Sequence, residues 1–193
     1  MLVAFEGLDQ SGKETQARML ADALRARGRR VETLSFPDYA TPIGREIGEA
    51  LAGNRDFPPD TMQLLYIANR YEWKPRMVDW LTDGAVVVCD RYLASSIAYG
   101  ESQGLDADWL FTTQRHLPQP ALTFVLDIAP ATAVQRKQRD RDRYERDLEL
   151  LSRVRASYQR QASAPGWTLI DGERGKDAIA AEILSLATSR LAL

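Results

Sequence analysis

The first sixteen residues constrain the fold more than any other part of the chain. An apolar run at Leu2–Phe5 leads into a glycine-containing loop, and an amphipathic helical pattern follows. This order of strand, loop, lysine and helix is typical of a phosphate-binding loop. Its glycines let backbone N–H groups approach phosphate oxygens, and Lys13 can reach the donor phosphates. The residues predicted to bind a nucleotide are Gly7, Leu8, Asp9, Gln10, Ser11, Gly12, Lys13, Glu14 and Thr15.

The loop departs from the usual pattern after its lysine. A Ser or Thr normally stands there because its hydroxyl binds Mg²⁺, but here Glu14 follows and the hydroxyl comes one residue later, at Thr15. The alternative interpretation is a plain glycine turn that joins a strand to a helix. The strand and helix patterns on either side favour the phosphate site.

Composition limits the class of protein. The 193 residues suit one domain with a core, and 25 basic against 27 acidic residues give no general attraction to nucleic acid. The single cysteine, Cys89, excludes an internal disulfide framework and fits a reducing compartment. Because we see no signal peptide and no apolar run of membrane length, we expect a cytoplasmic protein without membrane contact.

Apolar runs alternate with helical periodicity along the whole chain. Strands are predicted at Leu2–Phe5, Val31–Phe36, Ala85–Cys89, Leu122–Asp127 and Thr168–Ile170. Helices are predicted at 13–27, 42–52, 60–81, 94–102, 106–116, 130–139, 144–162 and 176–192. The alternation predicts an α/β fold in which helices flank both faces of a parallel sheet. Ligands of such sheets bind beyond the carboxyl ends of the strands.

Asp90-Arg91-Tyr92 follows one of these buried strands directly. A carboxylate at a strand end can hold Mg²⁺, and Arg91 could bridge two phosphoryl groups. The alternative is a helix cap at Asp90 beside a surface arginine.

Tyr66 and Arg70 lie four residues apart in the predicted long helix and therefore share a face. An aromatic ring and a guanidinium in this arrangement could hold a planar base. A core tyrosine with a surface arginine is the alternative, and locally it is slightly favoured.

Charged residues are dense between Gln135 and Asp147, where arginines alternate with acidic residues. Such a run is usually a solvated helix face. Beside a phosphate-binding loop it could instead be a lid whose arginines close over the transferred phosphate.

Together these segments resemble the thymidylate kinase family over nearly the whole chain. The matching signatures are Phe5-Glu6-Gly7-Leu8-Asp9, Phe36-Pro37, Ala68-Asn69-Arg70, Asp90-Arg91-Tyr92 with Ser95, Ala98 and Tyr99, Leu117-Pro118-Gln119-Pro120-Ala121, and Asp142-Arg143-Tyr144-Glu145. The resemblance implies a P-loop NTPase fold of the nucleoside monophosphate kinase type, with a five-stranded parallel sheet. It also implies Mg²⁺-dependent transfer of the γ-phosphate of ATP to dTMP, and a homodimer.

The resemblance also implies residue roles. Tyr66 takes the place of an aromatic residue that stacks on thymine, Arg70 contacts the thymine carbonyl, and Tyr99 disfavours a 2′-hydroxyl. Arg91 binds the acceptor phosphate, and Asp9 faces the 3′-hydroxyl and phosphate region. The complete set of predicted acceptor residues is Asp9, Phe36, Tyr39, Tyr66, Arg70, Arg91, Ser95, Ser96, Tyr99, Tyr144 and Glu145.

Two residues depart from the family pattern, Gln10 in the loop and Glu14 after its lysine, and the first of them shapes the catalytic prediction. Gln10 stands where an arginine often supplies charge, so we expect that arginine from a lid at about 135–147. The candidates are Arg139 and Arg141, with Arg136 behind them. Catalysis is therefore assigned to Lys13, Asp9, Arg91, Arg139 and Arg141.

For the metal, Asp90 is the first candidate and Glu14 the second. The alternatives for function are another nucleotide or deoxynucleoside kinase of this fold, or a nucleotide-binding protein without turnover.

Overall fold

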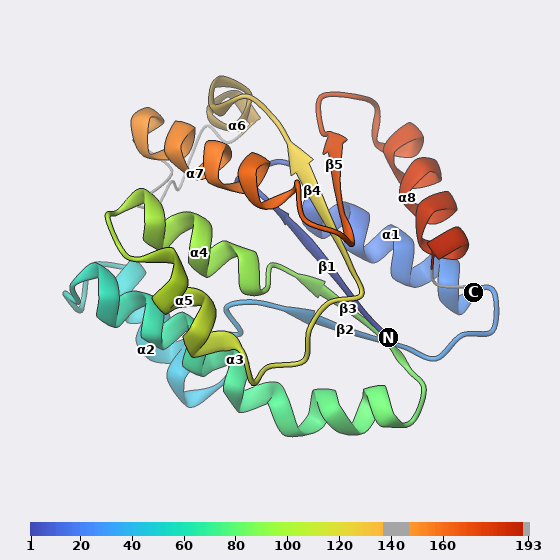
Figure 1. Ribbon diagram of the computed structural model, residues 1–193, viewed down its shortest axis with the longest axis horizontal. Helices are drawn as coiled ribbons and strands as arrows, with labels where there is room; N and C mark the ends of the chain where they lie inside the picture. The colour runs from blue at the N-terminus through green and yellow to red at the C-terminus, as the bar shows by residue number, and fades with distance from the viewer. Residues whose placement is uncertain (137–146, 191–193) are drawn as a thin grey trace.

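The computed structural model describes residues 1–136 and 147–190, and these form a three-layer α/β structure (Figure 1). A sheet of five parallel strands has the order β2-β3-β1-β4-β5. The strands are β1 (Leu2–Gly7), β2 (Val31–Ser35), β3 (Val86–Asp90), β4 (Leu122–Asp127) and β5 (Trp167–Asp171). The predicted five-stranded parallel sheet is confirmed.

Eight helices are present in the described residues. They are α1 (Lys13–Arg25), α2 (Pro42–Leu51), α3 (Pro59–Thr82), α4 (Leu93–Ser102), α5 (Ala107–Gln114), α6 (Pro130–Arg136), α7 (Leu148–Gln161) and α8 (Lys176–Arg190). The apolar residues of α1 and α8 pack on one face of the sheet, and those of α3, α4 and α7 pack on the other (Figure 1). Both faces are therefore covered, which explains why β1, β3 and β4 are nearly continuous apolar runs.

Predicted element ends agree with the structure to within about two residues for most elements. The largest difference in the described residues is α5, which is shorter at its end than the predicted 106–116. Its start is set by Asp106, whose side chain accepts a hydrogen bond from the backbone N–H of Trp109. The predicted helix end at 139 and the predicted start at 144 lie outside the described residues.

The neighbouring parallel strands β3, β1 and β4 end side by side. The three loops that follow them therefore lie at one edge of the sheet. Gly7 closes β1 with a φ of +134°, and a Cβ there would lie 2.5 Å from the carbonyl oxygen of Leu126. Only glycine fits so close to the neighbouring strand. The chain can therefore turn sharply from β1 into the loop that precedes α1, beside the end of β3 at Asp90.

Candidate active site

The predicted phosphate-binding loop wraps the N-terminus of α1. Gly12 precedes the helix in a left-handed conformation with a φ of +93°. The Lys13 side chain is only 8% exposed, and its Nζ donates to the carbonyl oxygen of Leu8 at 3.1 Å. Burial lowers the pKa of Lys13, while Asp9 and Asp90 oppose that shift by favouring the ammonium form. The loop thus holds a cation at the N-terminus of α1.

A cavity lies over this loop. It is lined by Asp9, Gln10, Gly12, Lys13, Glu14, Thr15, Ser35, Phe36, Pro37, Tyr39, Asp90 and Arg91. Six of the nine predicted loop residues therefore face the same space as the Asp-Arg pair at the end of β3, whereas Gly7, Leu8 and Ser11 do not line it. This is the arrangement expected of a site for donor phosphates.

Asp90 fits the requirements of a metal site. Its Oδ1 atom is buried and has no hydrogen-bond partner, and burial raises its pKa, as does the nearby charge of Glu14. Glu14 is exposed and lines the same cavity. Within the described residues, no three potential metal-ligating side chains gather at one point. A Mg²⁺ ion here would thus depend on water and phosphate oxygens for most of its shell, as this ion commonly does.

Arg91 occupies the centre of the site and is not a surface residue. Its side chain is 14% exposed, and its backbone has a φ of +62°, which is uncommon for a residue with a side chain. Its Nη2 donates to Asp9 Oδ1 at 2.6 Å, and its Nη1 donates to Ser95 Oγ at 3.2 Å. Its guanidinium also lies 5.4 Å from the ring centre of Tyr99. The predicted anion-binding arginine is thus held in one orientation.

Asp9 completes this group. Its carboxylate accepts hydrogen bonds from Arg91 and from the Tyr99 hydroxyl, the latter at 3.2 Å. Burial alone would raise the pKa of Asp9, but the charges of Arg91 and Lys13 outweigh it and hold the pKa well below its usual value. Asp9 is therefore ionised at neutral pH.

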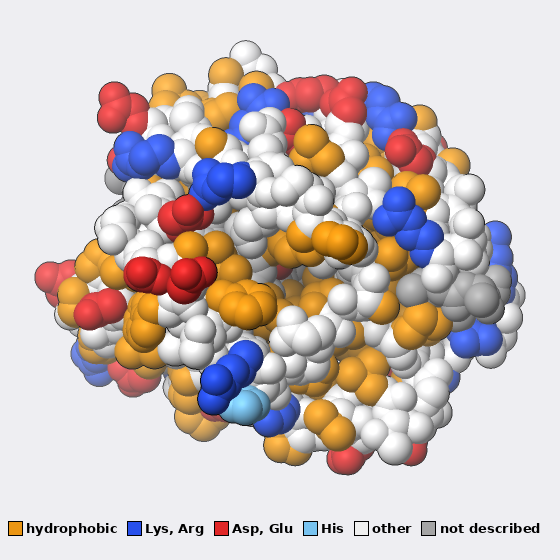
Figure 2. Space-filling view, in the orientation of Figure 1, with side chains coloured by type: hydrophobic (Ala, Val, Ile, Leu, Met, Phe, Trp, Pro, Cys, Tyr) orange, Lys and Arg blue, Asp and Glu red, His pale blue; other side chains and the backbone are white. Residues whose placement is uncertain are grey.

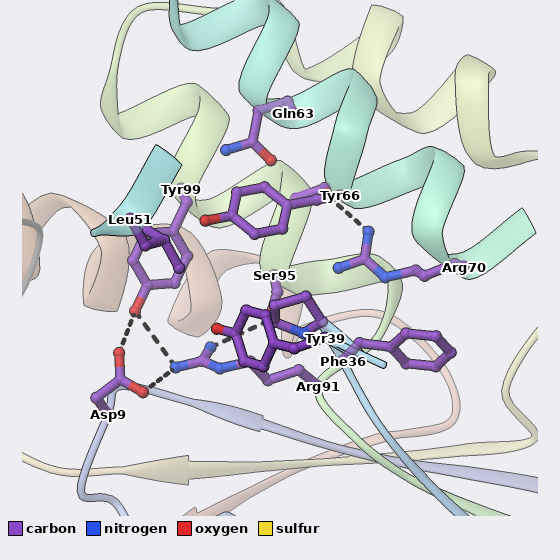
Figure 3. Close-up of a pocket in the computed structure, with 12 residues that line it drawn as sticks. Asp9, Phe36, Tyr39, Leu51, Gln63, Tyr66, Arg70, Arg91, Ser95 and Tyr99 are labelled. Atoms are coloured by element: carbon purple, nitrogen blue, oxygen red, sulfur yellow. Dashed lines mark hydrogen bonds and ion pairs between the residues drawn. The ribbon is translucent and has the colours of Figure 1, made fainter. Parts of the chain in front are cut away.

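A second cavity adjoins the first and matches the predicted base site (Figure 3). Arg70 is 3% exposed, and its Nη1 donates to Ser96 Oγ at 2.7 Å and to Gln114 Oε1 at 3.3 Å. Its guanidinium also lies 6.0 Å from the ring centre of Phe36. The locally favoured alternative of a surface arginine at this position is wrong, because the crossing of α3 over α4 and α5 encloses it.

The residues that line this second cavity include all nine of the predicted acceptor residues that the structure describes. They are Asp9, Phe36, Pro37, Tyr39, Leu51, Gln63, Tyr66, Arg70, Arg91, Ser95, Ser96 and Tyr99. Five of them, Asp9, Phe36, Pro37, Tyr39 and Arg91, also line the cavity over the phosphate-binding loop. The two cavities thus meet at the Asp9–Arg91 pair.

A buried carboxylate that was not among the predicted site residues lies behind this pair. Glu6 is 0% exposed and accepts from the backbone N–H groups of Tyr92 and Ala94 and from Ser95 Oγ, at 2.8, 3.2 and 2.6 Å. Tyr158 of α7 joins the same network through Ser95 and Glu6. The available signal was a glutamate directly after the apolar run Leu2–Phe5, a position where a carboxyl group needs hydrogen-bond partners.

Of the three arginines predicted to act from a lid, the structure describes one. Arg136, the third lid candidate, donates to the carbonyl oxygens of Gln10 and Gly172, each at 3.1 Å, and so lies against the phosphate-binding loop. Four other predicted site residues lie outside the described residues: Arg139, Arg141, Tyr144 and Glu145.

Comparison with known proteins agrees with this geometry. The family model for thymidylate kinase matches residues 5–183. A thymidylate kinase from Dictyostelium discoideum is 32% identical over 98% of this chain and 85% of its own length, and one from Homo sapiens is 32% identical over 96% and 89%. A solved thymidylate kinase from Candida albicans superposes with a TM-score of 0.85 at 29% identity, covering 97% of this chain and 91% of its own. These matches span both cavities and all five strands, and the chain belongs to the thymidylate kinase family.

Proposed function

We propose that the two adjoining cavities are the donor and acceptor halves of one phosphoryl-transfer site. As a member of its family, the protein phosphorylates dTMP to dTDP with ATP and Mg²⁺. The observation that carries the site assignment is that Asp9 and Arg91 line both cavities. An acceptor phosphate beside Arg91 would therefore lie next to the phosphates held by the loop at Lys13.

The acceptor half suits a pyrimidine deoxynucleotide. Tyr66 and Arg70 follow one face of α3, so a base stacked on the ring of Tyr66 would have its edge near a guanidinium. We assign Arg70 to a carbonyl of the base and Phe36 to the wall of the cavity. Tyr99 lies between the part of the cavity assigned to the base and Asp9, where its side chain would exclude a 2′-hydroxyl.

The chemistry depends on positioning and on charge rather than on a strong base. Lys13 and Arg91 place two cations around the transferring group, and Asp9 orients Arg91 and the acceptor. Mg²⁺ would neutralise charge on the donor phosphates, and Asp90 is the residue that we assign to hold it, with Glu14 as the second candidate.

We also propose that the segment at about 135–147 is a lid of the single domain 1–193, and that Arg139 or Arg141 supplies charge in the transition state. Gln10 cannot supply it, which supports this assignment. Arg139→Ala or Arg141→Ala should lower kcat far more than it raises KM for dTMP. Normal kcat in both single variants and in the double variant would refute a catalytic lid.

We further propose that the protein is a homodimer. Large apolar side chains are exposed on α3 and α5, among them Leu64 at 44%, Trp109 at 36% and Phe111 at 59%. Figure 2 shows apolar side chains gathered near the middle of the face that carries α5, with charged side chains towards the rim. Such a patch is typical of a protein interface, and light scattering after gel filtration would report the mass.

We place the reaction in the cytoplasm, where the single thiol of Cys89 would stay reduced. Among the helices that the structure describes, none has the length and apolar character to cross a bilayer.

The direct test of the assignment is a panel of acceptors assayed with ATP, with and without Mg²⁺. We expect dTMP to give the highest kcat/KM, above dUMP, dCMP and UMP, and no turnover without the metal. Equal or better turnover of dCMP or UMP would move the protein to another kinase specificity. If no acceptor were turned over, the protein would be a nucleotide-binding protein without kinase activity.

A further inference from the structure

The acceptor cavity contains a buried amide that neither the sequence signatures nor the family resemblance assigned. Gln63 is 1% exposed and lines the cavity, and its Oε1 is a buried polar atom without a hydrogen-bond partner. It lies three residues before Tyr66 and seven before Arg70, so all three side chains share one face of α3. Figure 3 shows its carboxamide directed toward the rings of Tyr66 and Tyr99.

The fold makes room for this side chain. Gly100 of α4 faces Gln63, and a Cβ at Gly100 would lie 3.2 Å from Gln63 Cγ and 2.5 Å from Leu110 Cδ1. A side chain at position 100 would therefore crowd Leu110 and Gln63, and the glycine leaves the space that the Gln63 stem uses. An unpaired amide oxygen in such a place costs stability unless a ligand supplies its partner.

The chemistry of a thymine base calls for an acceptor in this cavity. Its Watson–Crick edge carries two carbonyl oxygens on either side of the N3–H donor. Arg70 has only donors and therefore suits a carbonyl. The N3–H group requires an acceptor oxygen, and Gln63 Oε1 is a buried oxygen of this cavity that has no partner within the protein.

Three other polar side chains of the cavity already have hydrogen-bond partners within the protein. Ser96 Oγ accepts from Arg70, and Asp9 is held by Arg91 and Tyr99. Ser95 Oγ is held by Glu6 and accepts from Arg91.

We propose that Gln63 is a specificity-determining residue whose Oε1 accepts the N3–H of the acceptor base. Cytosine presents an unprotonated nitrogen at N3, so the two acceptors would face one another and dCMP would be disfavoured. The proposal rests on the assignment of this cavity to the acceptor nucleotide and adds a second contact on the base edge beside Arg70.

The test compares dTMP with N3-methyl-dTMP, which keeps both carbonyls and loses the N3–H donor. Gln63→Met keeps the size of the side chain and removes the amide. We expect this variant to lower kcat/KM for dTMP roughly 10- to 100-fold while changing kcat/KM for N3-methyl-dTMP less than about 3-fold. The preference for dTMP over dCMP should fall by a similar factor. Gln119→Met, an exposed glutamine outside this cavity, is the matched control and should change neither ratio.

If Gln63→Met lowered kcat/KM equally for dTMP and N3-methyl-dTMP, or lowered it for neither, the proposal would be overturned. A side chain with a packing role alone would not distinguish the two substrates. A wild-type protein inactive on dTMP would instead refute the proposed function.

If Gln63→Met fails to fold, the wild type can be tested with dTMP labelled with ¹⁵N at N3. Its imino proton should be protected from exchange and show a nuclear Overhauser effect to the Gln63 amide protons. Exchange as fast as in free dTMP would overturn the proposal.

Discussion

The Asp9–Arg91 pair gives the sharpest prediction about the energetics of the site. Asp9→Asn would remove the carboxylate that lies 2.6 Å from the Arg91 guanidinium, leaving a nearly buried cation without its counter-charge. Breaking a fully buried pair costs about 3–5 kcal/mol. The Asp9 side chain is 33% exposed, so solvent screening reduces the effect, and we expect a loss of roughly 1–3 kcal/mol in the free energy of unfolding. For a chain of this size, each kcal/mol lowers Tm by about 2–4 °C.

The acceptor phosphate should relieve this loss. With dTMP bound, its phosphate would supply the missing negative charge beside Arg91, and Asp9 would no longer repel it. We expect urea titrations to show a difference in the free energy of unfolding between wild type and Asp9→Asn, and this difference should become smaller at saturating dTMP. A smaller difference is equivalent to tighter binding of dTMP by the variant.

Asp127→Asn is the matched control. Asp127 accepts from Arg155 Nε at 2.6 Å and Nη2 at 2.8 Å but lies outside the acceptor cavity, so its loss should not depend on dTMP. A free energy of unfolding of Asp9→Asn equal to that of wild type would refute the reasoning. A difference between the two that dTMP leaves unchanged would refute it as well.

The Asp9–Arg91 pair also makes the free energy of unfolding depend on pH in acid. Because the folded state holds the pKa of Asp9 below its ordinary value, the contribution of the pair is complete above the usual carboxyl range. It is lost as the pH falls through the lower, folded-state pKa. The stability difference between wild type and Asp9→Asn should therefore be constant from pH 6 to 8 and should narrow in strong acid.

Three further variants test other parts of the site. Lys13→Ala should cut kcat by roughly 10²–10⁴-fold with a modest effect on dTMP binding, and activity within a few-fold of wild type would remove the loop from the donor site. Tyr99→Ala should shift the ratio of kcat/KM for dUMP over UMP by about 1–3 kcal/mol toward UMP, and an unchanged ratio would reject the 2′ role. Glu14→Ser, which restores the usual hydroxyl, should keep or raise activity and lower the Mg²⁺ needed for half-maximal rate; a variant that needs much more metal would identify Glu14 as a ligand.

Much of the fold follows from local patterns in the sequence. The runs at Val86–Val88 and Leu122–Leu126 are apolar except for Thr123, because both faces of the sheet are covered, and they alone locate two central strands. The turn at Gly7 follows equally from local chemistry, because a lysine and a second glycine stand nearby. These are features in which neighbouring residues decide the structure.

The support behind the site could not be predicted in the same way. Glu6 meets Ser95 across 89 residues, Arg70 meets Gln114 across 44, and Asp127 meets Arg155 across 28. Each contact depends on how helices cross the sheet, and spacing along the chain does not determine that crossing. Gln63 is a similar case, since its helical spacing to Tyr66 was visible but its burial against Gly100 was not.

The most direct test of the site assignment is a crystal structure with dTMP, Mg²⁺ and a non-hydrolysable ATP analogue bound together. We predict the thymine against the ring of Tyr66 with a carbonyl facing Arg70, its phosphate on Arg91, and the γ-phosphate group of the analogue beside Lys13. A thymine bound outside the cavity of Tyr66 and Arg70, or an acceptor phosphate without contact to Arg91, would contradict the assignment.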